Sequence, residues 1–452
     1  MAAGTASLES IRTEVEKRGI EFFFAQFVDL YGRPSAKLVP AQHLDDLVEE
    51  GAGFAGFAAG EIGQVPADPD IAAIPDLDSF TPVPWQPNLA RFACDVTVEG
   101  QAWPYCPRTI LKNVIAKAAE QGYEFKIGIE LEYFLVTQNE DGSIEIADKY
   151  DTLDKPCYDM AGLTRRYDFL TTVSKYCNEL GWGNYANDHE DANGQFEQNF
   201  QYADALTTCD RAIFFRYMVH TLAEQHGFIA TFMPKPFTNL TGNGAHMHMS
   251  LWKDGENVFA DDSDPRGLGL SSLAYNFVGG LKAHARASSA MTAPTVNSYK
   301  RLKPGSTSSG ATWSPVWISY GYNNRTQMLR INPGRIEDRT IDGSCNPYLA
   351  AAAVLTAGLD GIQKGMDAGE PNGENLYTKS YEELTARGLR SLPANLLDAT
   401  VELERDDVLR AAFGRGRDED YVDYYIRVKR EEWFRYHEQV SQWEIKEFLT
   451  RF

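Results

Sequence analysis

The chain has 452 residues, of which 43% are hydrophobic and 12% are aromatic. This length favours two domains, and this composition excludes an intrinsically disordered chain. The formal net charge of −21 argues against nucleic acid as a partner, because no Lys/Arg-rich run is present to neutralise phosphates.

Hydropathy and cysteine usage predict a cytoplasmic protein with no membrane partner. No apolar run approaches the roughly 20 residues that cross a bilayer, and residues 1–12 lack the apolar segment of a signal peptide. The six cysteines form no Cys-x-x-Cys pair. They are typical of free thiols in a reducing compartment, and they predict neither a disulfide framework nor a zinc site.

The first hundred residues alternate between short helical and strand patterns. The expected helices are 8–18 and 43–60, the second running into a Gly/Ala-rich loop at 51–58, and the expected strands are 22–30, 35–40, 70–78 and 90–98. A proline-rich stretch at 84–107 marks a boundary. We therefore predict a small α+β N-terminal domain at residues 1–105 and a second, larger domain at residues 106–452.

Longer elements follow the proline-rich stretch. The expected helices are 108–121, 168–180, 212–226 and 346–366, and the expected strands are 125–134, 228–233 and 244–252. The charged segment from residue 381 onward is expected to be mostly helical. The mixture of helices and strands places the chain in the α+β class.

Two of these strands carry polar side chains on one face. Glu130 and Glu132 are two apart in an apolar strand, so they point the same way, and two buried like charges are costly unless a cation neutralises them. His246, His248 and Ser250 alternate with apolar residues in the strand at 244–252. These faces indicate the walls of a site, although a solvated edge strand and an ordinary hairpin are the plainer interpretations.

Further acidic residues extend the candidate ligand set. Glu190 and Glu197 flank a turn-rich loop that can fold both carboxylates toward one point, and Glu337 lies between strand-like neighbours. Five glutamates with His246 form a mostly oxygen ligand set, which suits Mg²⁺ or Mn²⁺ and disfavours zinc or copper. Two such ions can clamp a transferring phosphoryl group.

Five arginines recur in the same part of the chain, and a guanidinium is well shaped to bind phosphate or carboxylate. They are Arg301, Arg325, Arg330, Arg335 and Arg339. Surface salt bridging is the plain alternative for any one of them. A nucleotide site here would not be a P-loop, since no Gly-x-x-x-x-Gly-Lys-Ser/Thr sequence is present.

The motifs around these residues resemble those of the glutamine synthetase family, in the family order and over nearly the whole chain. They are Gly128–Phe134, His189–Glu197, Phe232–Pro236 with Gly244–Ser250, Asn297–Leu302 and Asn346–Leu349. The resemblance implies a β-grasp N-terminal domain and a catalytic domain built on an antiparallel split barrel with helices. It also implies a homo-oligomer of stacked hexameric rings, a dodecamer, with active sites between subunits.

The resemblance implies a role for each matching residue. One divalent metal would be held by Glu132, Glu190 and Glu197, and another by Glu130, His246 and Glu337. ATP, the co-substrate, would contact His248, Ser250 and Arg335, while the glutamate substrate would contact Gly242, Arg301 and Arg339. Arg325 and Arg330 would contact the transferring phosphate, and Glu190 is our choice among nearby acids for the group that deprotonates the amine.

Two departures from the family pattern bear on the choice of amine. Ammonia-using glutamine synthetases carry Asp-Gly-Ser-Ser in an N-terminal loop, where the aspartate binds ammonium; here the run is Ala55-Gly56-Phe57-Ala58. The family's flap also carries a glutamate, and here the segment after Gly305 continues with serine and threonine instead. An apolar pocket of Ala55, Phe57 and Ala58 would welcome a methyl group, worth about 0.8 kcal/mol when buried.

These features are similar to the γ-glutamylmethylamide synthetase branch of the family. They predict an ATP-dependent ligase that joins glutamate to methylamine and gives γ-glutamylmethylamide, ADP and phosphate. Ordinary glutamine synthetase using ammonia is the alternative, because a pocket rarely rejects a smaller substrate strongly, and a ligase for another small amine follows. A non-catalytic member of the family is disfavoured, because all six metal positions are retained.

Overall fold

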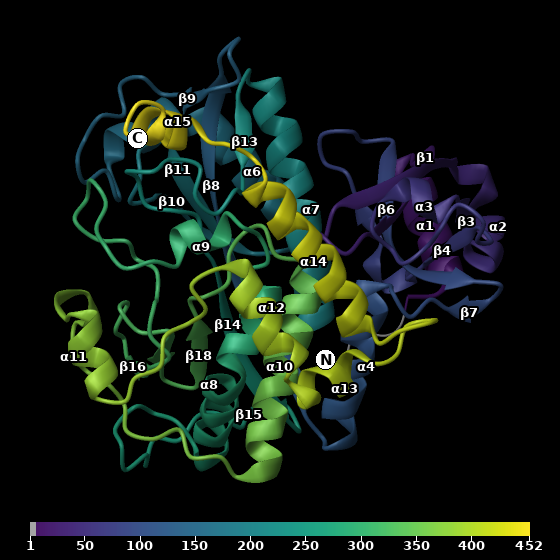
Figure 1. The fold of residues 1–452 in the computed structure, drawn as a ribbon. Coiled ribbons are helices and arrows are strands. Elements are labelled where there is room, and N and C mark those ends of the chain that lie inside the picture. Colours follow the sequence, from purple (N-terminus) through teal and green to yellow (C-terminus); the bar gives the residue numbers. More distant parts are fainter. Residues whose placement is uncertain (1–5) are drawn as a thin grey trace.

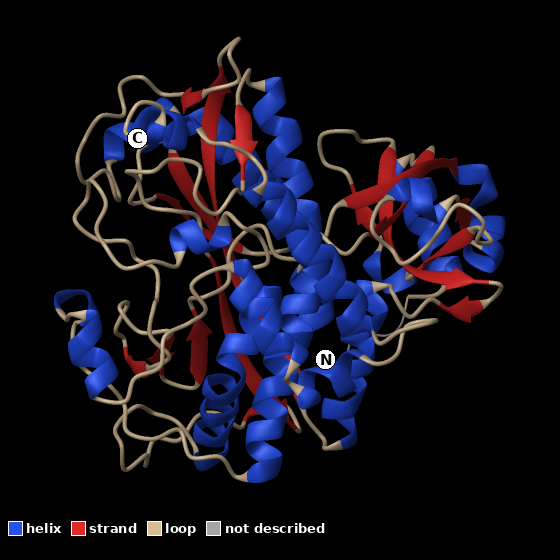
Figure 2. Cartoon of the chain, in the orientation of Figure 1, coloured by secondary structure: helices blue, strands red, loops and turns tan. Residues whose placement is uncertain are grey.

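Two β-sheets organise the chain, and helices pack against both (Figures 1 and 2). The computed structural model describes residues 6–452. Its mixture of helices and strands confirms the predicted α+β class. Among the described helices, none is both long enough and apolar enough to span a bilayer. All six cysteines are free thiols, and Cys157 alone among them is partly exposed.

The first sheet has seven strands in the order β2-β1-β6-β4-β3, with β5 and β7 paired to β6. Its strands are β1 (Phe22–Val28), β2 (Pro34–Pro40), β3 (Ala52–Phe54), β4 (Ile71–Pro75), β5 (Thr81–Pro82), β6 (Leu89–Val98) and β7 (Gln101–Ala102). Its helices are α1 (Leu8–Arg18), α2 (Leu44–Glu50) and α3 (Gly56–Ala59), with short 3₁₀ turns at Ala41–His43 and Leu77–Ser79. The domain boundary near residue 105 stays a prediction.

The helix expected at 43–60 is wrong beyond its first half. Helix α2 ends at Glu50 because Gly51 adopts a positive φ of 77°, and a Cβ there would lie 2.6 Å from the side chain of Ile74. The chain then pairs with β4 as strand β3 before the single turn of α3. The expected Gly/Ala-rich loop is therefore a strand followed by a short helix.

The second sheet has eleven strands in the order β10-β11-β8-β14-β18-β17-β16, with four short strands paired to β8 or β14. The central strands are β8 (Glu124–Gln138), β10 (Asn184–His189), β11 (Gln195–Phe200), β14 (Ala245–Lys253), β16 (Tyr320–Tyr322), β17 (Leu329–Asn332) and β18 (Arg335–Asp338). The short strands are β9 (Ile144–Ile146), β12 (Ala203–Asp204), β13 (Ile229–Thr231) and β15 (Glu256–Asn257). This sheet contains every predicted metal-ligand residue except Glu190, which directly follows β10.

Helices cover this sheet, as Figure 1 shows for α7, α8, α10, α12 and α14. Their bounds are α4 (Pro107–Glu120), α5 (Met160–Arg165), α6 (Tyr167–Glu179), α7 (Ala205–Gln225), α8 (Ser272–Thr292), α9 (Ser298–Arg301), α10 (Pro347–Lys364), α11 (Tyr381–Ala386), α12 (Leu396–Glu404), α13 (Asp407–Phe413), α14 (Tyr421–His437) and α15 (Gln442–Phe448), with a 3₁₀ turn at Leu376–Thr378. Helix α10 is buried all round from Pro347 to Gly361, as its alanine-rich sequence suggests.

A buried arginine joins the two sheets. Arg108, on α4, donates to Asp210 of α7, to Asp95 of β6 and to Asp76 after β4, at 2.8–3.0 Å. Three carboxylates around one buried guanidinium neutralise its charge and satisfy its donors. The contact fixes the first sheet against the helices that support the second.

Candidate active site

The register of the second sheet brings the candidate ligands together. Glu197 pairs with Glu132 between β11 and β8, and His246 pairs with Glu130 between β14 and β8. Glu337 pairs with His248 between β14 and β18. Directly opposed residues on neighbouring strands have Cβ atoms about 4.5–5.5 Å apart, so four strands, β11, β8, β14 and β18, present their polar side chains to one region.

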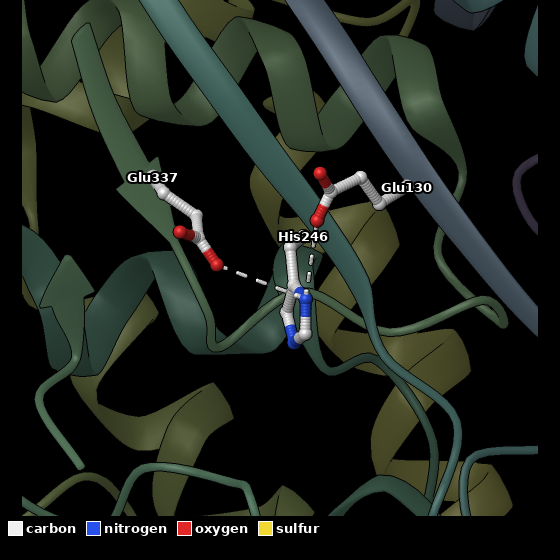
Figure 3. A group of neighbouring side chains, drawn as sticks. All are labelled: Glu130, His246 and Glu337. Atoms are coloured by element: carbon white, nitrogen blue, oxygen red, sulfur yellow. Dashed lines mark ion pairs between the residues drawn. The ribbon is translucent and has the colours of Figure 1, made fainter. Parts of the chain in front are cut away.

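The first group of possible metal ligands is Glu130, His246 and Glu337, one from each of the strands β8, β14 and β18 (Figure 3). The Nδ1 atom of His246 lies 3.7 Å from a Glu130 oxygen and 3.8 Å from a Glu337 oxygen. One donor atom from each of the three residues fits within a 4.8 Å span. This set coincides with one of the two sets that the family resemblance implies.

Two further groups lie along β8, β10 and β11. One contains Glu132, Glu197 and His246, and the other contains Asp188, Glu190 and Glu197. All six predicted metal-ligand residues thus come together around shared members. Asp188, which the sequence did not single out as a ligand, joins them because it pairs with Glu197 across the β10–β11 hairpin.

Two of these carboxyl groups lie where burial and neighbouring carboxylates disfavour ionisation. Burial, together with repulsion from Glu132 and Asp188, raises the pKa of Glu190 to about 8. Burial and the charges of Glu130, Glu190 and Glu132 raise the pKa of Glu197 well above its usual value. Buried like charges of this kind are stable when a cation is present between them.

Glu337 has the opposite electrostatic environment. It accepts from Arg330 at 2.7 Å through one oxygen and from Arg339 at 2.5 Å through the other. Burial opposes its ionisation, but Arg339, the two histidines of β14 and Arg330 outweigh that effect and lower its pKa to about 2. The Glu337 carboxylate is therefore ionised at neutral pH.

The donor set fits a hard divalent cation. It consists of carboxylate oxygens and a single imidazole, and the pKa of His246 is lowered by burial and by Arg339, which keeps its ring nitrogen free of a proton. Oxygen-rich sets of this kind favour Mg²⁺ or Mn²⁺ over zinc or copper. A cation among Glu190 and Glu197 would offset the repulsion that raises their pKa values.

Gly242, Arg301 and Arg339, the positions expected to hold the glutamate substrate, are buried beside the carboxylates. A Cβ on Gly242 would lie 2.3 Å from the carbonyl oxygen of Pro234 and 3.2 Å from the Arg301 side chain, so only glycine fits. The guanidinium of Arg301 donates to the carbonyl oxygens of Thr340 and Arg339. These contacts fix its orientation next to the cluster.

The two arginines expected to contact phosphate differ in their surroundings. Arg330 on β17 is held against Glu337 and also donates to Asn323 at 2.5 Å. Arg325 lies in the preceding turn with an exposed side chain. The structure therefore places Arg330 at the cluster and leaves Arg325 at the rim.

A cavity of about 350 Å³ adjoins the cluster on the side of Glu130. Its walls include His248, Ser250 and Arg335, the three residues expected to contact ATP. Tyr202 and Trp252, which the sequence analysis did not identify, stack at 6.4 Å on its wall. The cavity thus joins a flat aromatic surface to a charged end, an arrangement suited to a base and its phosphates.

Gln195 contacts the candidate ligands, and the sequence analysis did not identify it. Its amide nitrogen donates to Glu132 at 3.2 Å, to the carbonyl oxygen of Gly242 at 3.1 Å and to Asn243 at 2.9 Å. The backbone N–H of Gly244 donates to the same Glu132 oxygen at 2.6 Å. These donors orient the Glu132 carboxylate, as outer partners do for metal ligands. The runs Asn193-Gly194-Gln195 and Gly242-Asn243-Gly244, rich in glycine and side-chain amides, were the features of the sequence that could have identified these donors.

The expected amine-pocket residues lie elsewhere in this chain. Ala55, Phe57 and Ala58 belong to the β3–α3 segment of the first sheet, which Figure 1 shows well apart from β8, β14 and β18. Phe57 is 58% exposed. A single chain does not bring these residues to the carboxylates, so their role in the amine pocket stays a prediction that requires a neighbouring chain.

Comparisons with known proteins identify relatives of this chain. Residues 104–448 match the family described as "Glutamine synthetase, catalytic domain". The chain is 45% identical to the glutamate–methylamine ligase of Methyloversatilis universalis, over 97% of this chain and 98% of the relative. It is 44% identical to a glutamine synthetase of Rhizobium leguminosarum bv. phaseoli, over 94% of this chain and 96% of the relative.

Solved structures show the same fold. A GmaS/ADP complex superimposes with a TM-score of 0.90 at 49% identity, over 97% of this chain and 98% of the other. A ligand-free GmaS structure superimposes with a TM-score of 0.88 at 47% identity, over 98% and 99% of the two chains. The family match over the catalytic part, the near-complete coverage of both relatives and the shared fold lead to one conclusion: the chain belongs to the glutamine synthetase family.

Proposed function

We propose that the protein is an ATP-dependent ligase that phosphorylates the γ-carboxylate of L-glutamate and couples it to methylamine. The products are γ-glutamylmethylamide, ADP and phosphate. The observation that carries this proposal is the cluster of buried carboxylates and arginines beside the 350 Å³ cavity. Support for methylamine comes from the apolar run at Ala55–Ala58 and from the similarity to a glutamate–methylamine ligase.

Binding of the substrates follows from the walls of the site. His248, Ser250 and Arg335 contact the nucleotide, whose base stacks on Tyr202 and Trp252. Arg301, Arg339 and Gly242 hold glutamate so that its γ-carboxylate faces the terminal phosphate. Mg²⁺ or Mn²⁺ bound at Glu130, Glu132, Glu190, Glu197, His246 and Glu337 would neutralise the charge that builds up between the two anions.

The chemistry has two steps. In the first, a γ-carboxylate oxygen attacks the terminal phosphorus of ATP, ADP leaves, and Arg325 and Arg330 stabilise the transferring phosphoryl group. In the second, the amine nitrogen attacks the acyl carbon and the bond from that carbon to the phosphate oxygen breaks. The Glu190 carboxylate takes the proton that the amine nitrogen loses.

An assembly of several chains completes the site in this proposal. The exposed Ala55–Ala58 segment of one subunit would close the amine pocket of its neighbour. An apolar wall there favours a methyl group without excluding ammonia. Ordinary glutamine synthetase activity, with ammonia as the amine, is the second candidate. Its support is the 44% identity to a Rhizobium glutamine synthetase.

The test of the proposal is a phosphate-release assay with product identification. Phosphate release from ATP is expected to require glutamate, a divalent cation and methylamine together, and mass spectrometry is expected to detect γ-glutamylmethylamide. Release that is independent of both glutamate and amine, or no release under any of these conditions, would exclude the ligase.

A further inference from the structure

The segment Leu302–Thr312 forms a loop beside the carboxylate cluster. It starts directly after Arg301 and runs through Gly305 and Gly310, whose φ angles are 135° and 98°. A Cβ at either glycine would meet nothing within 4 Å. The two glycines lie in open space in a conformation that other residues rarely adopt, which makes them suitable hinges for the residues between them.

Ser308 and Ser309 donate hydrogen bonds from this loop to residues outside it, and Thr307, whose hydroxyl donates to the carbonyl oxygen of Ala311 within the loop, packs beside them. Ser309 donates to Oδ2 of Asp191 at 2.5 Å. Ser308 donates to the carbonyl oxygen of Asn239 through its N–H at 2.9 Å and through its hydroxyl at 3.1 Å. The Thr307 hydroxyl lies 3.0 Å from that of Ser309 and 3.4 Å from that of Thr241.

Asp191 is the centre of this network. Its Oδ2 atom also accepts from the Thr241 hydroxyl at 2.5 Å, so a single carboxylate oxygen ties the loop to the segment that leads into β14. Hydrogen bonds to an ionised carboxylate are roughly twice as strong as those between neutral groups. Thr241 is buried and immediately precedes Gly242, so the network ends at the wall expected to hold glutamate.

We propose that Asp191 is a positioning residue that latches the Leu302–Thr312 loop closed over the site through Ser309. The loop itself carries serine and threonine where the family's flap carries a glutamate, and the latch supplies a carboxylate from the opposite wall instead. This role rests on the proposed function, because the closed loop keeps water from the γ-glutamyl phosphate until the amine attacks. Water attacking that acyl carbon would release phosphate and return glutamate, and ATP would be consumed without amide formation.

The first test measures the loop directly, on the full-length protein without substrates. Ser309→Ala is expected to raise hydrogen exchange of loop amides about tenfold, the effect of losing one hydrogen bond to a charged group. Ser306→Ala is the matched control, since Ser306 lies on the same loop and is exposed, with no side-chain hydrogen bond among the described residues. Equal exchange in the wild type and Ser309→Ala would overturn the latch, whatever reaction the protein performs.

The second test measures coupling as the ratio of phosphate released to amide formed. Asp191→Ala and Ser309→Ala are expected to raise this ratio several-fold, while Asp191→Asn, which keeps an acceptor oxygen, is expected to recover part of the coupling. Ser306→Ala is expected to match the wild type. An unchanged ratio in both Asp191→Ala and Ser309→Ala would contradict the positioning role, whereas absence of amide in the wild type would contradict the proposed function instead.

Discussion

Glu190 is a single side chain with two proposed roles, as a metal ligand and as the base that deprotonates the amine. Its carboxylate belongs to a possible ligand group with Asp188 and Glu197, and we propose that it also takes the amine proton. Replacing it by glutamine keeps the shape and removes the base. We expect Glu190→Gln to lower amide formation by at least about 100-fold, the usual contribution of a positioned base.

The discriminating measurement compares amide formation with Mn²⁺ affinity in the same variant. Glu145→Gln is a suitable control, because Glu145 is the exposed residue of strand β9 and lies outside the ligand groups. If Glu190→Gln bound Mn²⁺ weakly yet formed amide at the wild-type rate under saturating metal, the base assignment would be wrong.

His284 is a pH-sensitive residue away from the site. On α8, it lies 2.6 Å from Asp406 and 3.0 Å from Asp360, through its two ring nitrogens. Burial alone would lower its pKa, but the two carboxylates outweigh burial and raise its pKa. Through these two contacts the ring bridges α8, α10 and the residue that caps the start of α13.

Because the pKa of His284 is higher in the folded state, its stabilisation is complete below the unfolded pKa of about 6.5 and is lost as pH rises through the folded pKa. We expect His284→Gln to lower the melting temperature more at pH 6 than at pH 9. The difference corresponds to about 1–2 kcal/mol for hydrogen bonds to charged partners. An equal loss at both pH values in thermal-shift experiments would show that the ring is neutral.

At the scale of elements, the crossing of α8 and α10 depends on small residues. A Cβ on Gly280 would lie 2.0 Å from the carbonyl oxygen of Ala357, and a Cβ on Gly361 would lie 2.2 Å from that of Asn276. We expect Gly280→Ala to lower the free energy of unfolding by about 3 kcal/mol, because backbone atoms must move apart. Gly373→Ala, where a Cβ meets nothing within 4 Å, is the control and should change it by less than about 0.5 kcal/mol.

Strong periodicity made some elements predictable. Strand β14 lies within one residue of its expected bounds, because His246 and His248 alternate with buried methionines. Helix α7 begins at Ala205, seven residues before the expected start, since the N-cap bond from Thr207 N–H to Asp204 was not recognised. Helix α8 was missed altogether, because its Gly279-Gly280 pair reads as a break unless the tight contact with α10 is known.

The candidate site was predictable where a motif placed ligands on strands. Glu130, Glu132 and His246 come together because β8 and β14 are neighbours in the sheet. The contact of Asp191 with Ser309 joins residues 118 positions apart, and no local pattern signals it. Sequence reasoning therefore found residues that the sheet brings together and missed side-chain contacts between segments that are far apart in the chain.

At the scale of the whole molecule, the proposed amine pocket requires two chains. We expect Phe57→Arg to abolish amide formation without unfolding its own subunit, since the side chain is 58% exposed. Glu197→Gln is expected to inactivate the carboxylate cluster of its own subunit. In randomly mixed oligomers, about a quarter of the interfaces pair an intact carboxylate cluster with an intact Ala55–Ala58 segment. Co-expressing the two variants should therefore restore up to about a quarter of wild-type activity.

The control for this experiment is each variant expressed alone, with assembly measured by light scattering. Activity in the mixed preparation no higher than the sum of the separate variants, despite normal assembly, would place the amine pocket within one chain. The mixed preparation therefore tests the shared site independently of which amine is used.

A comparison of kcat/KM for methylamine, ammonia and ethylamine at one pH tests which amine the proposed ligase uses. The apolar Ala55–Ala58 wall is expected to favour methylamine over ammonia, because burying one methyl group contributes about 0.8 kcal/mol, roughly fourfold. Methylamine is therefore expected to give the highest kcat/KM of the three amines. A higher kcat/KM for ammonia would contradict this expectation and identify the protein as a glutamine synthetase in activity as well as in family.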